Sequence, residues 1–168
     1  MPIVLSVKQE EDEMMTLENW APFLAFFGIG MLGLGLSGSA IGLSIGGSAV
    51  TGMRGEKRGQ GIAVSVLPGT QGLYSFAVGF LCLQKLTPFM KDPSQEGFVS
   101  ACVIVMASGL VTGIACLFSG WYQGVVCAAG IKSINQDKMP MGQALLLAVF
   151  PEFYAILSLA FSALMLYS

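Results

Sequence analysis

One carboxylate in this chain lies where a charge is costly. Glu152 is the only acidic or basic residue placed to reach the middle of a membrane, within the apolar run 144–167. An ionised side chain at the centre of a bilayer costs about 2.5–3.5 kcal/mol on insertion scales, so it is normally neutralised by a proton, a cation or a partner. The other apolar runs hold no arginine or histidine, and their one lysine, Lys85, sits at a helix end. The first hypothesis is therefore an ion carrier.

Several oxygen-bearing groups could join this carboxylate in a cation site. The candidates are the carbonyl of Leu67, the hydroxyl of Thr70, the amide oxygens of Gln71 and Gln123, and the carboxylate of Glu152. Five oxygen groups with one negative charge suit a hard monovalent cation, whereas a divalent ion normally attracts more carboxylates. The alternative for the threonine and the two glutamines is ordinary hydrogen bonding between helices.

Two prolines and a tyrosine complete the candidate site. We expect Pro68 and Pro151 to break their helices in mid-membrane, because proline lacks an N–H and disturbs the preceding turn. Freed carbonyls at that depth are tolerable where they face a polar site. Tyr74 could donate a hydrogen bond to Glu152 and hold its rotamer, a supporting role behind the direct ligands.

The composition is that of a membrane protein. Hydrophobic residues make up 54% and charged residues 11% of the 168 residues, against about 25% charged in soluble domains. The net charge of -2 without a basic patch argues against a nucleic-acid partner. No phosphate loop, nucleophile–base pair or metal cluster is visible, so we expect neither catalysis by this chain nor an organic cofactor. The four cysteines read as small buried hydrophobes: Cys82, Cys102, Cys116 and Cys127.

The hydropathy pattern predicts an all-α membrane protein with four transmembrane helices. Each apolar segment exceeds the roughly 20 residues that span a bilayer; they are 20–51, 60–86, 98–131 and 142–167. We divide the chain into a polar acidic tail (1–18), a first hairpin (19–86), an outer connection (87–97) and a second hairpin carrying the ion site (98–168). Lysine and arginine counts of 3 and 2 in loops 52–59 and 132–141, against 2 around the middle connection, place those two loops in the cytoplasm.

The two hairpins are tandem copies of one unit. A shift of 83 residues brings 67–69 onto 150–152, and a shift of 82 brings Ser37-Gly38 onto Ser119-Gly120. Parallel repeats of this kind occur in membrane proteins. Gly69 stands opposite Glu152, so one ionisable site remains per pair of hairpins.

Small residues recur four apart in the first and third segments. Their glycines include Gly38, Gly42 and Gly46, then Gly120 and Gly124. Such spacing lets helix backbones approach closely. It is compatible either with the inner wall of a ring or with ordinary packing inside one subunit.

Three motifs resemble a known family. The stretches LPGTQGLY (67–74), LFSGWYQG (117–124) and EFYAI (152–156) resemble subunit K, the proteolipid or c subunit of V-type (V/A-type) ATPases, and the likeness covers about residues 20–167. It implies a ring of identical four-helix subunits that turns against a stator membrane subunit of the a or I type. A central-stalk subunit would meet the cytoplasmic loops and couple the ring to ATP hydrolysis or synthesis.

The resemblance also bears on the ion. Sodium-carrying members use positions that match Leu67, Thr70, Gln71, Gln123 and Glu152, with a tyrosine matching Tyr74. The oxygen ligands favour Na⁺, whereas H⁺ needs only the carboxyl group. Phe153 departs from the small polar residue expected there, which leaves the ligands intact but alters the face toward lipid or stator. We expect a multi-pass protein in the cell membrane of a prokaryote.

Two other classes of function remain open at this point. A stand-alone ion transporter built from duplicated hairpins would work without ATPase partners. A structural membrane proteolipid would not need Glu152, so its substitution would be silent.

Overall fold

The computed structural model describes residues 17–92 and 95–168, and all their regular structure is helical. The α-helices are α2 (Leu17–Met31), α3 (Gly33–Thr51), α4 (Arg58–Ser65), α5 (Thr70–Leu86), α6 (Phe98–Asn135) and α7 (Met141–Tyr167). Three short 3-10 helices join them: η1 (Gly55–Lys57), η2 (Leu67–Gly69) and η3 (Thr87–Met90).

These elements form four helical rods long and apolar enough to cross a membrane. The rods are Asn19–Thr51, Gly55–Met90, Phe98–Asn135 and Met141–Tyr167. The predicted all-α architecture with four transmembrane helices is confirmed. Of the predicted polar tail, only residues 17–18 belong to the described part of the chain, where they begin α2.

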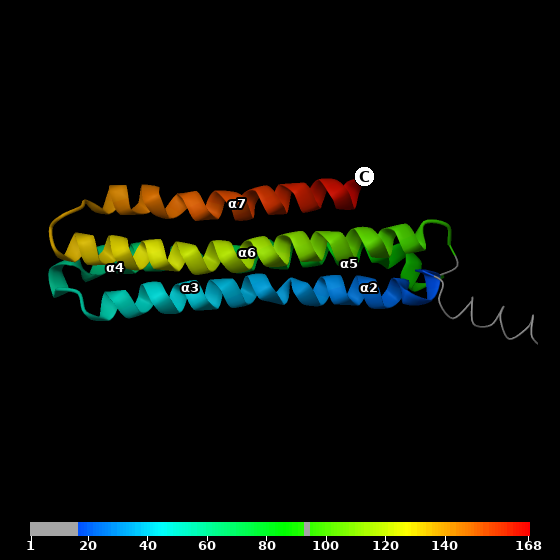
Figure 1. Ribbon diagram of the computed structural model, residues 1–168, viewed down its shortest axis with the longest axis horizontal. Coiled ribbons are helices and arrows are strands. Elements are labelled where there is room, and N and C mark those ends of the chain that lie inside the picture. The colour runs from blue at the N-terminus through cyan, green and yellow to red at the C-terminus, as the bar shows by residue number, and fades with distance from the viewer. Residues whose placement is uncertain (1–16, 93–94) are drawn as a thin grey trace, which may run out of the picture.

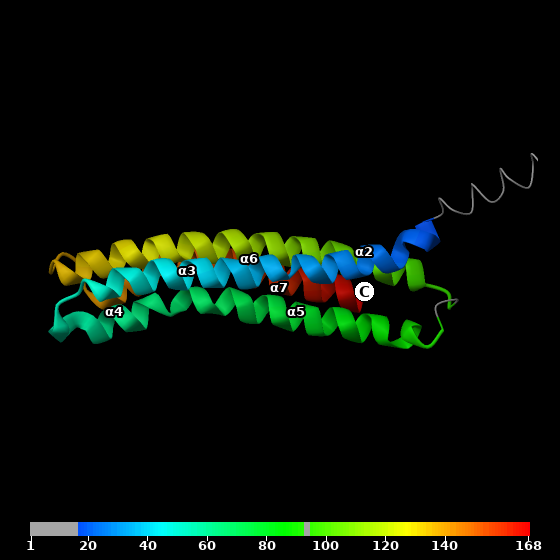
Figure 2. The ribbon, with the colours of Figure 1, turned by 90° about the horizontal axis from the view of Figure 1, so that it is seen from below.

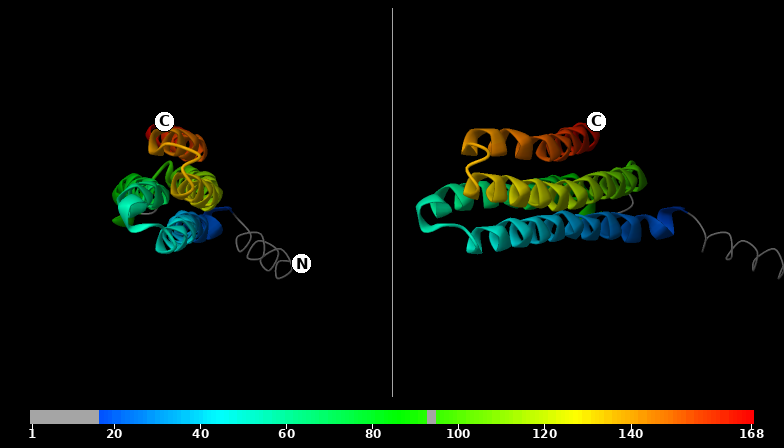
Figure 3. Two further views of the ribbon diagram at one scale, coloured as in Figure 1. Left: turned by 90° about the vertical axis from the view of Figure 1, so that its left-hand side faces the viewer. Right: turned by 60° about the vertical axis from the view of Figure 1, so that its left-hand side comes forward.

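The rods run side by side along one axis (Figure 1). Loops 52–59 and 132–141 lie at one end, and connection 87–97 lies at the other end near the start of α2 (Figure 2). Seen end-on, α5 and α6 form a middle layer with α7 on one side and α2–α3 on the other (Figure 3). The helix α6 therefore touches all three other rods, which suits it to carry side chains into a shared site.

The first and third rods meet through the repeated glycines. A Cβ added to Gly38 would lie 2.6 Å from the Leu117 Cα, and one added to Gly120 would lie 2.7 Å from the Gly38 carbonyl. Real Cβ atoms do not come so close to backbone, so only glycine permits this spacing. Packing within one subunit thus accounts for these glycines, whereas Gly30 and Gly47 have open space beside them.

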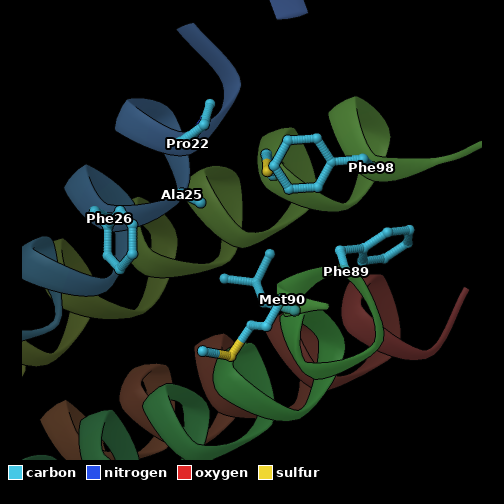
Figure 4. A pocket seen from close by; sticks show the side chains of 8 residues that line it. Pro22, Ala25, Phe26, Phe89, Met90 and Phe98 are labelled. Carbon is cyan, nitrogen blue, oxygen red and sulfur yellow. The ribbon is translucent and has the colours of Figure 1, made fainter. Parts of the chain in front are cut away.

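A cluster of buried apolar side chains lies toward each end of the bundle. The cluster near connection 87–97 includes Val78, Cys82 and Val105, and the cluster near loops 52–59 and 132–141 includes Val64 and Ile131. All four cysteines are free and buried, as predicted. At the end near connection 87–97 an apolar pocket opens between α2, η3 and α6, with Phe26, Phe89 and Phe98 around it (Figure 4). The buried polar side chains Gln71 and Gln123 lie between the two apolar clusters.

Ion pairs and hydrogen bonds join loops 52–59 and 132–141 at the end of the bundle where both lie. Asp137 accepts hydrogen bonds from Arg54 and Lys57, and the Arg54 N–H donates to the Asn135 side chain at 2.9 Å. Lys57 first, and then Arg54, hold the pKa of the Asp137 carboxyl below its usual range. We call Arg54, Lys57, Asn135 and Asp137 the loop clamp.

Substituting Asp137 with asparagine tests the loop clamp. Its φ of 58° lies in the left-handed region, which asparagine tolerates, so the backbone should keep its course while the ion pairs are lost. We expect faster amide hydrogen exchange in residues 52–59 and 132–141, with transmembrane helices unchanged. Because the pKa of Asp137 is lowered in the folded state, wild type should show the same loosening only when the pH falls through that lowered pKa. Glu96→Gln, which changes an exposed acid at the opposite end of the bundle, is the control, and equal exchange in both variants would contradict the role of Asp137.

Candidate ion-binding site

Glu152 lies on α7 between the two apolar clusters, half-buried and hydrogen-bonded through both carboxylate oxygens. The Tyr74 hydroxyl of α5 donates to Oε1 at 2.8 Å. The Gln123 Nε2 of α6 donates to Oε2 at 3.2 Å. Donors from two neighbouring helices therefore hold the rotamer of this acid, and Tyr74 makes the contact that the sequence predicts.

A pair of buried amides continues the network from the carboxylate. Gln71 and Gln123 are both fully buried. The Gln71 Nε2 donates to the Gln123 Oε1 at 2.7 Å, and the Gln123 Nε2 also donates to the Ala148 carbonyl at 2.9 Å. The two amides thus link α5, α6 and α7 at the depth of Glu152, which places three of the five predicted ligands in one network.

The other two predicted ligands lie at the start of α5. The 3-10 helix η2 ends at Gly69, and the Thr70 hydroxyl donates to the Leu67 carbonyl at 3.1 Å. Both residues are half-buried, and they lie four residues and one residue before Gln71 in the chain. They are joined to one another, and the bonds that link Gln71, Gln123 and Glu152 do not include them. The Thr70 hydroxyl keeps its lone pairs, since it acts as donor in its bond to Leu67.

The two prolines differ in their effect on the helices. Pro68 sits in η2, where the regular helix is interrupted between α4 and α5. In contrast, α7 continues through Pro151, so the predicted break at that residue is wrong. Carbonyls in the turn before and at Pro151 accept side-chain hydrogen bonds from α6, on Ala148 from Gln123 and on Pro151 from Ser119. These two bonds join α6 to the backbone of α7 around the proline.

Ser119 belongs to the network, although the sequence singled it out only as a repeat match. Its hydroxyl accepts from the Gln71 Nε2 at 3.1 Å and donates to the Pro151 carbonyl at 2.8 Å. The signal that could have found it was its spacing, because Ser119 lies four residues before Gln123 and therefore on the same face of α6.

The donor set suits a small hard cation. The Gln71 Oε1 is buried and has no hydrogen-bond partner in the described part of the chain. A buried acceptor without a partner is costly unless something such as an ion engages it. Across residues 17–92 and 95–168 no group of three or more His, Cys, Asp or Glu side chains gathers as a metal site, so one carboxylate supplies the charge. One charge and several neutral oxygens favour a monovalent ion.

Fold and site together define a four-helix membrane protein with one buried acid among neutral oxygen donors. The family of the ATP synthase C subunit matches residues 106–165. The chain is 35% identical over 141 residues to V-type sodium ATPase subunit K of Enterococcus hirae, covering 83% of this chain and 82% of the relative.

Two further relatives extend the comparison. A-type ATP synthase subunit K of Methanocaldococcus jannaschii is 34% identical over 90% of this chain, which spans 64% of that relative. The c' subunit of the V-type proton ATPase of Eremothecium gossypii is 32% identical over 79% of this chain and 80% of the relative.

The chain therefore belongs to the family of V-type and A-type ATPase K or c subunits, which confirms the resemblance seen in the sequence. Proteins of this family are non-catalytic, ion-translocating subunits that assemble into rings. The chain is an integral membrane protein of this kind. Its relatives include both sodium and proton ATPase subunits, so membership alone leaves the ion open.

Proposed function

We propose that this chain is the rotor-ring subunit of a sodium-carrying V/A-type ATPase, with Na⁺ bound by Glu152 and its neighbours. The observation that carries the proposal is the buried Gln71 Oε1, an acceptor without a partner in the described part of the chain, at the level of the carboxylate. A proton carrier needs the carboxyl alone and gives no reason to bury that oxygen. The ligands are the two amide oxygens, the Glu152 carboxylate, and the Leu67 carbonyl and Thr70 hydroxyl from the neighbouring turn.

Charge neutralisation would let the occupied Glu152 site move through lipid as the ring turns. With Na⁺ bound, Glu152 is close to neutral and can pass through lipid at small cost. Without it, the charged carboxylate favours an aqueous or positively charged surface, which a stator membrane subunit would supply. Ions would enter and leave through separate half-channels beside the stator membrane subunit, and apolar clusters lie on either side of the site within the bundle.

Coupling to ATP requires contact with soluble subunits. Loops 52–59 and 132–141 lie together at one end of the bundle and carry exposed Arg58, Lys132 and Lys138. They form the surface that we assign to the central-stalk subunit, on the cytoplasmic side of a prokaryotic cell membrane. The lysine and arginine bias of these loops supports that orientation.

Carbodiimide labelling of Glu152 with and without sodium tests the proposal. The reagent attacks the protonated acid, so a cation that displaces the proton should protect the residue. At a fixed, mildly acidic pH we expect millimolar NaCl to slow labelling severalfold, while choline chloride at the same ionic strength has no effect. The Glu152→Gln protein identifies the labelled site. Labelling that follows pH and ignores sodium would show a proton carrier instead.

A further inference from the structure

Ser119 makes one of the two hydrogen bonds that orient the Gln71 side-chain amide. Both hydrogens of the Gln71 Nε2 are engaged, one by the Gln123 Oε1 at 2.7 Å and one by the Ser119 Oγ at 3.1 Å. Two bonds in different directions fix the plane of the amide. They also fix its polarity, because the nitrogen faces the two acceptors and Oε1 is left without a partner in the described part of the chain.

Ser119 can accept this bond because its own proton is already placed. Its hydroxyl donates to the Pro151 carbonyl at 2.8 Å, so it presents a lone pair, and not its hydrogen, to Gln71. Ser119 is itself buried, with 6% of its surface exposed, so water does not compete easily for either bond. A chain of bonds therefore runs from α7 through α6 to α5, and it starts at the residue that precedes Glu152 in the sequence.

We propose that Ser119 is a positioning residue for cation binding, which holds the Gln71 amide so that its oxygen is free to bind Na⁺. This inference rests on the proposed sodium function. Without the hydroxyl, one Gln71 hydrogen would be buried without an acceptor, and the amide would be held by Gln123 alone. The Gln123 Oε1 would still require the Gln71 nitrogen on its side, but the amide could rotate about that one bond, which would move the Gln71 Oε1 away from its position for the cation. Ser119 makes no hydrogen bond to Glu152 and reaches the carboxylate only through Gln71 and Gln123.

The test compares sodium protection of Glu152 in Ser119→Ala and wild-type membranes. Losing a residue that orients a metal ligand typically costs 10–100-fold in affinity. We expect the NaCl concentration that halves the labelling rate to rise at least tenfold in Ser119→Ala. The labelling rate without sodium is measured for each protein, and sodium protection is expressed relative to that rate. Ser119→Thr, which retains a hydroxyl, should restore sodium protection.

Ser108→Ala is the matched control, since Ser108 is a fully buried serine on the same helix whose hydroxyl has no partner in the described part of the chain. It should leave both quantities unchanged. An unchanged sodium midpoint in Ser119→Ala, relative to its own labelling rate without sodium, would overturn the inference. If the alanine protein does not accumulate, Ser119→Cys, which is similar in size but a weak hydrogen-bonding group, gives the same comparison.

The two proposals fail in different ways. If wild type shows no sodium protection, the sodium function fails and the role of Ser119 in cation binding fails with it. If wild type is protected and Ser119→Ala is protected equally, only the positioning role is lost.

Discussion

Replacing Glu152 with glutamine is expected to abolish ATP-driven ion uptake while the protein still inserts and assembles. Glutamine has nearly the same shape and still offers one oxygen to Tyr74 or Gln123, so local packing should survive. It cannot become negatively charged, so it neither releases a proton nor balances a cation. Transport should fall to the level of vesicles without ATP, as measured by ion uptake into vesicles that contain the complete ATPase.

Glu96→Gln is the control for this experiment, because Glu96 is an exposed acid in the connection between the hairpins. It should transport at the wild-type rate. Native electrophoresis of both variants reports assembly separately from activity. Undiminished transport by the Glu152→Gln protein would exclude the ion-carrier function and favour a structural proteolipid.

Gly120→Ala should destabilise the protein strongly, although it adds only one methyl group. The new Cβ would lie 2.7 Å from the carbonyl group of Gly38 and 3.0 Å from the Ser39 nitrogen. These atoms are backbone, so no flexible side chain can move aside and the two helices must separate. Overpacking of this kind typically costs about 1–3 kcal/mol. We expect a lower temperature of unfolding for the purified protein and less of it in membranes.

Gly47→Ala provides the comparison, since nothing in the described part of the chain lies within 4 Å of the corresponding Cβ. Alanine is the better helix former, so this change should be neutral or slightly stabilising. If both variants unfold at the wild-type temperature, close backbone contact between α3 and α6 does not limit stability. The pair of variants thus separates the effect of the contact from that of the added methyl group.

Hydropathy predicts the four helices because length and apolar composition are sufficient to identify a membrane span. The same reasoning finds Glu152, Gln71 and Gln123, since polar side chains stand out in apolar segments. The interruption at Leu32 between α2 and α3 was not predicted, and its surroundings offer only a high density of glycine. The predicted break at Pro151 was wrong: α7 continues through this residue, and proline removes only one backbone hydrogen bond from a helix.

Contacts between distant segments were the least predictable. The sequence does not show that Ser119 joins the network, because its hydrogen bonds depend on the rotamer of Gln71 and the position of the Pro151 carbonyl. The loop clamp joins Arg54 to Asn135 and Asp137, which are 81 and 83 positions further along the chain, and no local sequence pattern predicts these contacts. The duplication did help, because it paired the hairpins and placed loops 52–59 and 132–141 at one end before any contact was known.

The loop clamp also affects how the protein would transmit force. The two hairpins are cross-tied by ion pairs at the end where the loops lie, whereas the opposite end is held by apolar contacts among α2, α5 and α6. A sideways force on either loop is therefore shared with the other before it reaches the helices. In a rotating ring, torque delivered at this end would move both hairpins as one stiff unit, and Glu152 would keep its position relative to Tyr74 and Gln123 under load.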